Sequence, residues 1–136
     1  GRANEDLVNA ALLDTHAFLW AALGDARLSS TAREFIEDTD SILYLSAVSA
    51  LEIAIKVSSR RMDLPEPPGA YVTSRLAKLG LLELPVSVEH SLRVADLPHI
   101  HGDPFDRLLV AQAQVEGLPI LTSDPQIRRY DVEVIW

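Results

Sequence analysis

The chain has 136 residues, of which 48% are hydrophobic and 24% charged, enough for one domain with a sizeable core. It contains no cysteine, which excludes disulfides and thiolate metal sites and fits a cytoplasmic protein, and neither a membrane span nor a secretory signal is visible. The net charge of −8 argues against a general nucleic-acid-binding module, which usually carries a basic surface, but it does not exclude a nuclease.

The predicted elements begin after a polar start, Gly1–Asn9, which we expect to be tag-derived or disordered. The hydrophobic pattern then alternates between short apolar runs and helical spacing. In chain order it predicts a strand at Ala11–Leu13, helices at His16–Leu23 and Ser29–Asp38, a strand at Ile42–Leu45 and a helix at Val48–Arg60. Thr31 and Glu34 stand at the spacing of a capping box in the second of these helices.

The second half of the chain opens with a proline-rich break at Leu64–Gly69. The elements predicted after it are helices at Tyr71–Leu79 and Val88–Val94 with a strand at Leu81–Leu84 between them, a helix at Pro104–Glu116, and strands at Ile120–Thr122 and Val132–Ile135. Gly80 and Gly117 are placed to end the helices that precede them.

Strands separated by helices are typical of βαβ units, so the sequence predicts an α/β fold with a parallel sheet of four to five strands. The crossovers in such a sheet are almost always right-handed. No repeat, low-complexity segment or long linker divides the chain, and we expect a single domain over residues 1–136.

Four acids follow apolar strands or begin helices: Asp14, Glu52, Asp106 and Asp124. Burial of an ionised carboxylate is costly unless a cation compensates it. Because the carboxyl ends of parallel strands meet at one edge of the sheet, we expect these side chains to converge. Such a cluster indicates a divalent metal ion and suggests cleavage of a phosphodiester.

Each acid also has a purely structural interpretation. Asp14 is a good N-cap for the helix that follows, although Thr15 offers an alternative cap.

Glu52 shares helical spacing with Val48, Leu51 and Ile55 on an apolar stripe. It could also form a capping box with Ser49 or an ion pair with Lys56. The i,i+4 ion pair contributes only about 0.2–0.5 kcal/mol, too little to offset deep burial of the charge.

Asp103 and Asp106 have different predicted roles. Asp103 precedes Pro104 and fits an N-cap, whereas Asp106 shares a stripe with apolar residues of the same helix and is predicted to face inward.

Asp124 precedes Pro125, and an Asp-Pro turn is its structural alternative. We expect His16 on a helix surface, and His99 and His101 to form local hydrogen bonds in the loop before the helix at 104.

The segments LLDTHAFLW, SALEIAIK, DPFDRLLVAQA and LPILTSD, in this order, resemble the motifs of PIN-domain ribonucleases, and most of all the VapC-type toxins of type II toxin–antitoxin systems. The resemblance covers the chain from about Leu12 to Trp136. HGDPFDRLLVAQA is its most specific piece. The family's site acids match the four acids named above, with Asp103 as an additional candidate ligand and Thr122 as a nearby polar residue.

The resemblance implies a three-layer α/β/α domain with Mg²⁺- or Mn²⁺-dependent endoribonuclease activity. We assign Asp14 and Asp106 as the principal metal ligands, and Glu52 and Asp124 as ligands that act directly or through water. Thr15 and Thr122 are predicted to contact substrate. The implied partners are RNA, a VapB-type antitoxin and a second copy of the chain.

Three alternatives remain at this point. The chain could be a housekeeping PIN nuclease of RNA maturation, which an adjacent antitoxin gene would argue against. It could be an inactive PIN scaffold, although the complete acid set disfavours this. A phosphotransfer domain would place a second acid two residues after Asp14, where this sequence has His16.

Overall fold

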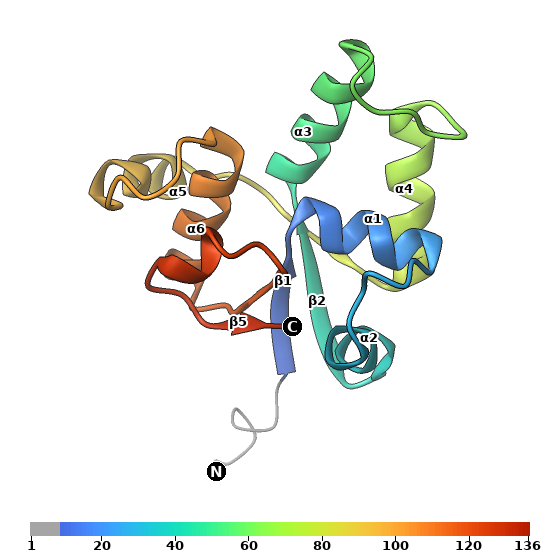
Figure 1. Ribbon diagram of the computed structural model, residues 1–136, viewed down its shortest axis with the longest axis horizontal. Coiled ribbons are helices and arrows are strands. Elements are labelled where there is room, and N and C mark those ends of the chain that lie inside the picture. The colour runs from blue at the N-terminus through green and yellow to red at the C-terminus, as the bar shows by residue number, and fades with distance from the viewer. Residues whose placement is uncertain (1–8) are drawn as a thin grey trace.

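A single sheet of five parallel strands organises the protein, which the computed structural model describes over residues 9–136 (Figure 1). The strands are β1 (Asn9–Leu13), β2 (Ser41–Ser46), β3 (Leu82–Leu84), β4 (Ile120–Leu121) and β5 (Val134–Ile135). They lie in the order β3-β2-β1-β4-β5, and every neighbouring pair is parallel. The predicted parallel sheet is confirmed. The expectation for Gly1–Asn9 falls mostly outside the described residues, but Asn9 opens β1 and is ordered.

Helices cover both faces of the sheet, so the predicted three-layer architecture is also confirmed (Figure 1). The α-helices of the described region are α1 (Thr15–Leu23), α2 (Ser30–Glu37), α3 (Ala47–Ser58), α4 (Pro68–Leu79), α5 (Val88–Arg93) and α6 (Pro104–Glu116). Successive strand residues point to opposite faces. Leu13 therefore packs in a core with Phe18 and Ile53, and Leu12 in a second core with Leu109 and Ile127.

The ends of the helices follow local capping chemistry. Gly80 and Gly117 end α4 and α6 with φ angles of 67° and 68°, a left-handed conformation that glycine adopts without a steric penalty. The capping box predicted for Thr31 is wrong, because Ser29 caps α2 through a bond from the Ala32 amide to its hydroxyl (3.0 Å). The proline-rich break is shorter than predicted, since Pro68 already occupies the first turn of α4.

Within residues 9–136, two single-turn 3₁₀ segments were not predicted: η2 (Val94–Asp96) and η3 (Ile127–Arg129). Each is too short to give a periodic pattern in the sequence. Both lie beside α6, one before it in the chain and one after β4. Among the helices of residues 9–136, none combines the length and apolar character needed to cross a membrane.

The register of the sheet aligns the carboxyl ends of its central strands. Leu13 at the end of β1 pairs with Leu45 of β2 and with Leu121 of β4. The residues that follow these positions are therefore neighbours, whatever their separation in sequence. Asp14 comes next after β1, and Thr122 comes next after β4.

Candidate metal centre

Asp14 lies directly after β1 and is both a helix cap and a buried acid. Its Oδ1 accepts a hydrogen bond from the Ala17 amide at 2.7 Å, which makes it the N-cap of α1. The alternative in which Thr15 caps this helix is wrong. The Asp14 side chain is only 5% exposed, and burial raises the pKa of its carboxyl group above the ordinary value.

Thr122, directly after β4, links Asp14 to Asp124 through two hydrogen bonds. The backbone amide of Asp124 donates to the Thr122 hydroxyl at 2.9 Å, and that hydroxyl donates to Asp14 Oδ2 at 2.5 Å. Oδ1 of Asp124 accepts from the Gln126 amide at 2.8 Å, so the turn predicted at this Asp-Pro sequence is present. Thr122 therefore lies between the two acids and is completely buried.

Glu52 reaches the same edge of the sheet from α3. Its Oε1 accepts from the Thr15 hydroxyl at 2.6 Å, and its Oε2 pairs with Lys56 at 2.7 Å. The ion pair with Lys56 is confirmed. A capping box with Ser49 is not formed, because Ser46 caps α3.

The apolar stripe predicted on α3 needs correction. Glu52 is 4% exposed, but Leu51 and Ile55 are 54% and 37% exposed. The buried face of α3 consists of Val48, Ser49, Glu52 and Ile53. Glu52 is thus inward-facing as expected, while the two exposed apolar side chains lie on a different face of the helix.

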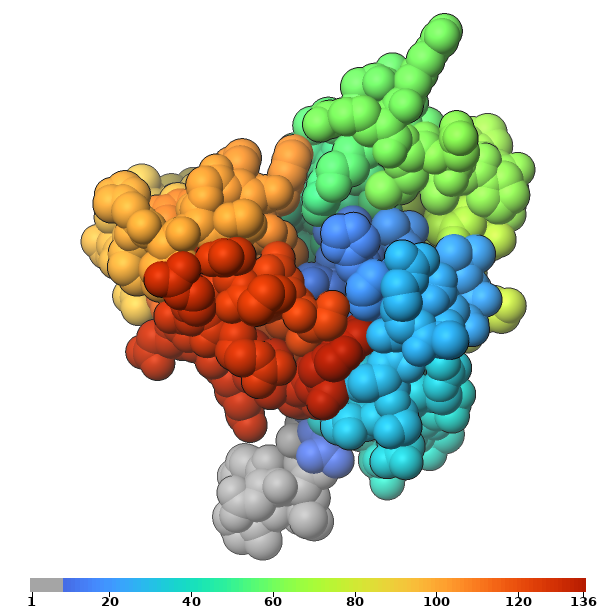
Figure 2. Space-filling view, viewed as in Figure 1, coloured from blue at the N-terminus to red at the C-terminus, as the bar shows by residue number. Residues whose placement is uncertain are grey.

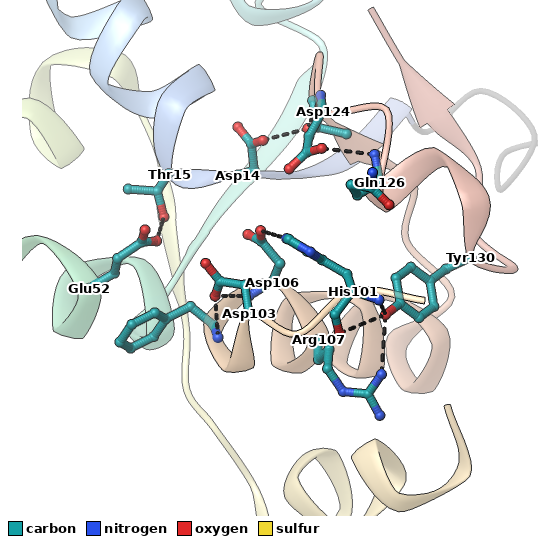
Figure 3. Close-up of polar contacts among 12 residues, drawn as sticks. Asp14, Thr15, Glu52, His101, Asp103, Asp106, Arg107, Asp124, Gln126 and Tyr130 are labelled. Atoms are coloured by element: carbon teal, nitrogen blue, oxygen red, sulfur yellow. Dashed lines mark hydrogen bonds and ion pairs between the residues drawn. The ribbon is translucent and has the colours of Figure 1, made fainter. Parts of the chain in front are cut away.

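The first turn of α6 places its two acids differently, and Asp103 is the cap that the sequence predicted. Oδ1 of Asp103 accepts from the amides of Phe105 (2.8 Å) and Asp106 (3.2 Å), and Pro104 occupies the first helical position. Asp103 is therefore the cap. Asp106 turns toward the other acids, with its Oδ2 3.0 Å from Nε2 of His101 (Figure 3).

Replacement of Asp103 by alanine should mainly destabilise the protein. Loss of an N-cap typically costs about 0.5–2 kcal/mol, so we expect a lower free energy of unfolding with most of the RNA cleavage retained. Denaturant unfolding and a cleavage assay measure the two effects, with Asp63→Ala on an exposed loop as the matched control. A stable but inactive Asp103→Ala protein would show that this carboxylate acts in the site.

The acids lie within one another's electrostatic field. Burial and, to a smaller extent, the charges of Asp103, Asp124 and Glu52 raise the pKa of Asp106 to about 6, although the hydrogen bond with His101 lowers it. The charge of Asp124 likewise adds to the raised pKa of Asp14. Four carboxylates from four segments therefore share one region, as Figure 3 shows and as the sequence predicted.

This donor set fits Mg²⁺ or Mn²⁺, which prefer oxygen ligands. Burial and the neighbouring acids raise the pKa values of Asp14 and Asp106, so a bound cation would favour the ionised form of both carboxyl groups. Figure 2 shows a recess where the surfaces of α1, α3 and α6 meet. His101 also lies here: one ligand atom from each of His101, Asp103 and Asp106 falls within 4.8 Å of the others. The sequence indicated only local hydrogen bonds for His101, because nothing in its spacing reveals Asp106 as the acceptor.

Comparison with known proteins agrees with this geometry. A family model described as the PIN domain matches residues 11–133. Ribonuclease VapC22 of Mycobacterium tuberculosis is 30% identical over 119 residues, which cover 88% of this chain and 90% of that protein.

The fold also matches solved structures at lower sequence identity. VapBC2 from Rickettsia felis, bound to a DNA fragment from its promoter, aligns with a TM-score of 0.70 at 14% identity over 92% of this chain and 96% of that one. DNA-bound VapBC from Salmonella typhimurium aligns with a TM-score of 0.64 at 15% identity over 93% and 96%. The chain therefore belongs to the PIN domain family and is a homologue of the VapC ribonucleases.

Proposed function

We propose that this chain is a VapC-type toxin, a metal-dependent endoribonuclease that belongs to a toxin–antitoxin pair. The observation that carries the proposal is the meeting of four acids at one edge of the sheet. The 30% identity with a protein named as a ribonuclease supports RNA as the substrate. Single-stranded or loop RNA is the expected target, because its bases are accessible to a protein, and RNA cleavage fits the predicted cytoplasmic location.

Asp14 and Asp106 are the proposed direct ligands of Mg²⁺ or Mn²⁺. Glu52 and Asp124 would bind the ion directly or through water, or orient the attacking water. A bound ion would compensate charge on the scissile phosphate and lower the pKa of a water molecule. The remaining work belongs to the protein: these carboxylates hold and orient the reacting groups, and in-line attack leaves 3′-hydroxyl and 5′-phosphate ends.

Thr15 and Thr122 were predicted to contact substrate. Both hydroxyls are buried and bonded to site acids, Thr15 to Glu52 and Thr122 to Asp14. This favours a role in orienting the two carboxylates. A hydrogen bond to an ionised carboxylate also favours its charged form, so Thr122 counteracts the effect of burial on Asp14.

The test is an RNA-cleavage assay on the full chain, first with a chelator and then with added Mg²⁺ or Mn²⁺. We expect cleavage only with metal, and fragments with 5′-phosphate ends. Cleavage at the same rate in the chelator would contradict metal dependence. An inert protein under all metal conditions would favour the alternative of a binding scaffold.

The proposed antitoxin-binding surface lies on α3 and α4. A groove of about 370 Å³ between these helices is largely apolar. Its lining includes Ala47, Ala50, Ala54, Val72 and Leu76. Leu51 and Ile55 expose further apolar surface on α3. Exposed apolar surface of this kind is typical of a protein-binding site, and the net charge of −8 suits a basic partner segment.

A homodimer is proposed through β3 and α5. Leu82 on the edge strand β3 is 52% exposed, and Val88 and Leu92, one turn apart on α5, are 76% and 69% exposed. We expect light scattering to give the mass of two chains, and Leu92→Glu to give the mass of one with an unchanged circular dichroism spectrum. A monomeric wild-type protein would contradict this surface assignment.

A further inference from the structure

Arg107 is a residue of the DPFDR segment that the acid cluster itself does not use. Its guanidinium donates three hydrogen bonds: from Nη1 to the Pro98 carbonyl (2.8 Å) and the Tyr130 hydroxyl (3.2 Å), and from Nη2 to the Val94 carbonyl (3.2 Å). One side chain of α6 thus ties together η2, the loop before α6 and the segment after η3. The planar guanidinium is suited to such multiple, fixed contacts.

Tyr130 continues this arrangement toward the acids. Its hydroxyl accepts the backbone N–H of His101 at 2.9 Å. The ring is 4% exposed and packs in the core formed with Leu109 and Ile127. The hydroxyl is therefore a fixed point on a rigid part of the protein, and it anchors the backbone of a loop residue that lacks regular secondary structure.

His101 connects the Tyr130 hydroxyl to Asp106, since its backbone is bonded to Tyr130 and its side chain to Asp106. Its Nε2 lies 3.0 Å from Asp106 Oδ2. An ionised carboxylate can only accept, so His101 donates from Nε2 whenever Asp106 is ionised. Figure 3 shows the resulting sequence of contacts from Arg107 through Tyr130 and His101 to Asp106, with Asp14 and Asp124 beyond. The bond restrains one oxygen of Asp106, and with it the orientation of the other.

His101 could instead be a direct metal ligand with Asp103 and Asp106, since these three lie close together. Two observations argue against this. Oδ1 of Asp103 already accepts two backbone hydrogen bonds as the cap of α6. The Nε2 atom of His101 already faces the carboxylate, and an ion with a preference for oxygen gains more from Asp106 than from the imidazole.

We propose that Arg107, Tyr130 and His101 form a positioning chain that orients the Asp106 carboxylate for metal binding. This inference rests on the proposed metal-dependent function. Partners that orient metal ligands typically change metal affinity by about 10–100-fold when they are removed. The three residues are positioning residues, because in this chain of contacts only the Asp106 carboxylate would hold the ion.

The first experiment measures Mn²⁺ affinity of the full chain by the loss of the free-ion electron paramagnetic resonance signal. We expect His101→Ala to raise the dissociation constant by about 10–100-fold. His101→Gln should restore part of the affinity, because its amide can still donate to Asp106. Tyr130→Phe, which removes only the anchoring hydroxyl, should raise the constant by a smaller factor.

The double variant separates positioning from general stability. If Tyr130 acts through His101, adding Tyr130→Phe to His101→Ala should leave the Mn²⁺ constant unchanged, although the melting temperature falls further. The control is Tyr71→Phe, the same change at another buried tyrosine, on α4, which should not alter Mn²⁺ affinity. Unchanged affinity in Tyr130→Phe and His101→Ala, or fully additive effects in the double variant, would overturn the proposal.

Pulsed resonance on the Mn²⁺-bound wild type tests the remaining alternative. We expect no coupling from a directly bound nitrogen, and a coupling that disappears in His101→Ala would make His101 a ligand and overturn its positioning role. The Asp14→Asn variant distinguishes a wrong metal site from a wrong positioning chain. If Asp14→Asn binds Mn²⁺ as tightly as wild type, the metal site itself is wrong; if it binds weakly while the His101 and Tyr130 variants bind normally, only the positioning chain is wrong.

Discussion

Asp14→Asn and Asp106→Asn should each abolish RNA cleavage while leaving the fold intact. Either change removes a negative charge from the cluster and keeps the shape of the side chain, and Asn at position 14 can still cap α1. Loss of one group that stabilises transition-state charge typically lowers the rate by about 10²–10³-fold, and a lost metal ligand should cost at least this much.

A time course on labelled RNA with saturating Mg²⁺ measures this effect, and circular dichroism checks the fold. Asp131→Asn, an equivalent change at an exposed aspartate, is the control and should cleave at the wild-type rate. Full activity in either site variant would show that the convergence of these acids has another purpose.

The same variants should be more stable than wild type in the absence of metal. The pKa of Asp106 is raised from 3.8 to about 6 in the folded protein, so the folded state holds a proton that the unfolded state has released. The wild-type protein therefore loses stability as the pH rises from 3.8 to about 6, and Asp106→Asn does not lose it. We expect the melting temperature of the variant, measured with a chelator, to exceed that of wild type by a margin that grows over this range. Equal melting curves at every pH would contradict the raised pKa of Asp106.

The complex of this chain with its antitoxin should be inactive toward RNA. An arginine of the partner can place its planar guanidinium against the carboxylates and bind them bidentately, in competition with metal and RNA. Purified complex should therefore fail to cleave RNA, and proteolysis of the antitoxin should restore cleavage. A complex that cleaves as fast as the free protein would rule out inhibition by occlusion.

A substitution in the groove on α3 and α4 should affect antitoxin binding without affecting RNA cleavage. Ala54→Glu places a charge in the apolar groove and should weaken antitoxin binding at least tenfold, about 1.4 kcal/mol, without altering RNA cleavage by the free chain. Ala26→Glu, in the loop after α1, is the matched control and should bind normally. Normal antitoxin affinity in Ala54→Glu would move the binding surface elsewhere.

The sequence by itself determined the order of the elements, the parallel sheet and the acids of the candidate site. These features depend on chemistry between near neighbours in the chain. Asp103 followed by Pro104 begins α6, Gly117 ends it, and the spacing of its apolar residues turns Asp106 inward. Local sequence gave the wrong cap for α2, where Ser29 and not Thr31 is the N-cap. It also gave the wrong buried face for α3, where Leu51 and Ile55 are exposed. In both helices the competing positions are alike in local sequence.

Only the tertiary structure decided what each acid touches. Thr122 meets Asp14 across the pairing of β1 with β4, and Thr15 meets Glu52 where α1 approaches α3. The contacts of His101 with Asp106 and of Arg107 with Tyr130 likewise depend on how a loop lies against α6. Side chains far apart in sequence become partners through the register of the sheet and the packing of its helices, and no local pattern carries that information.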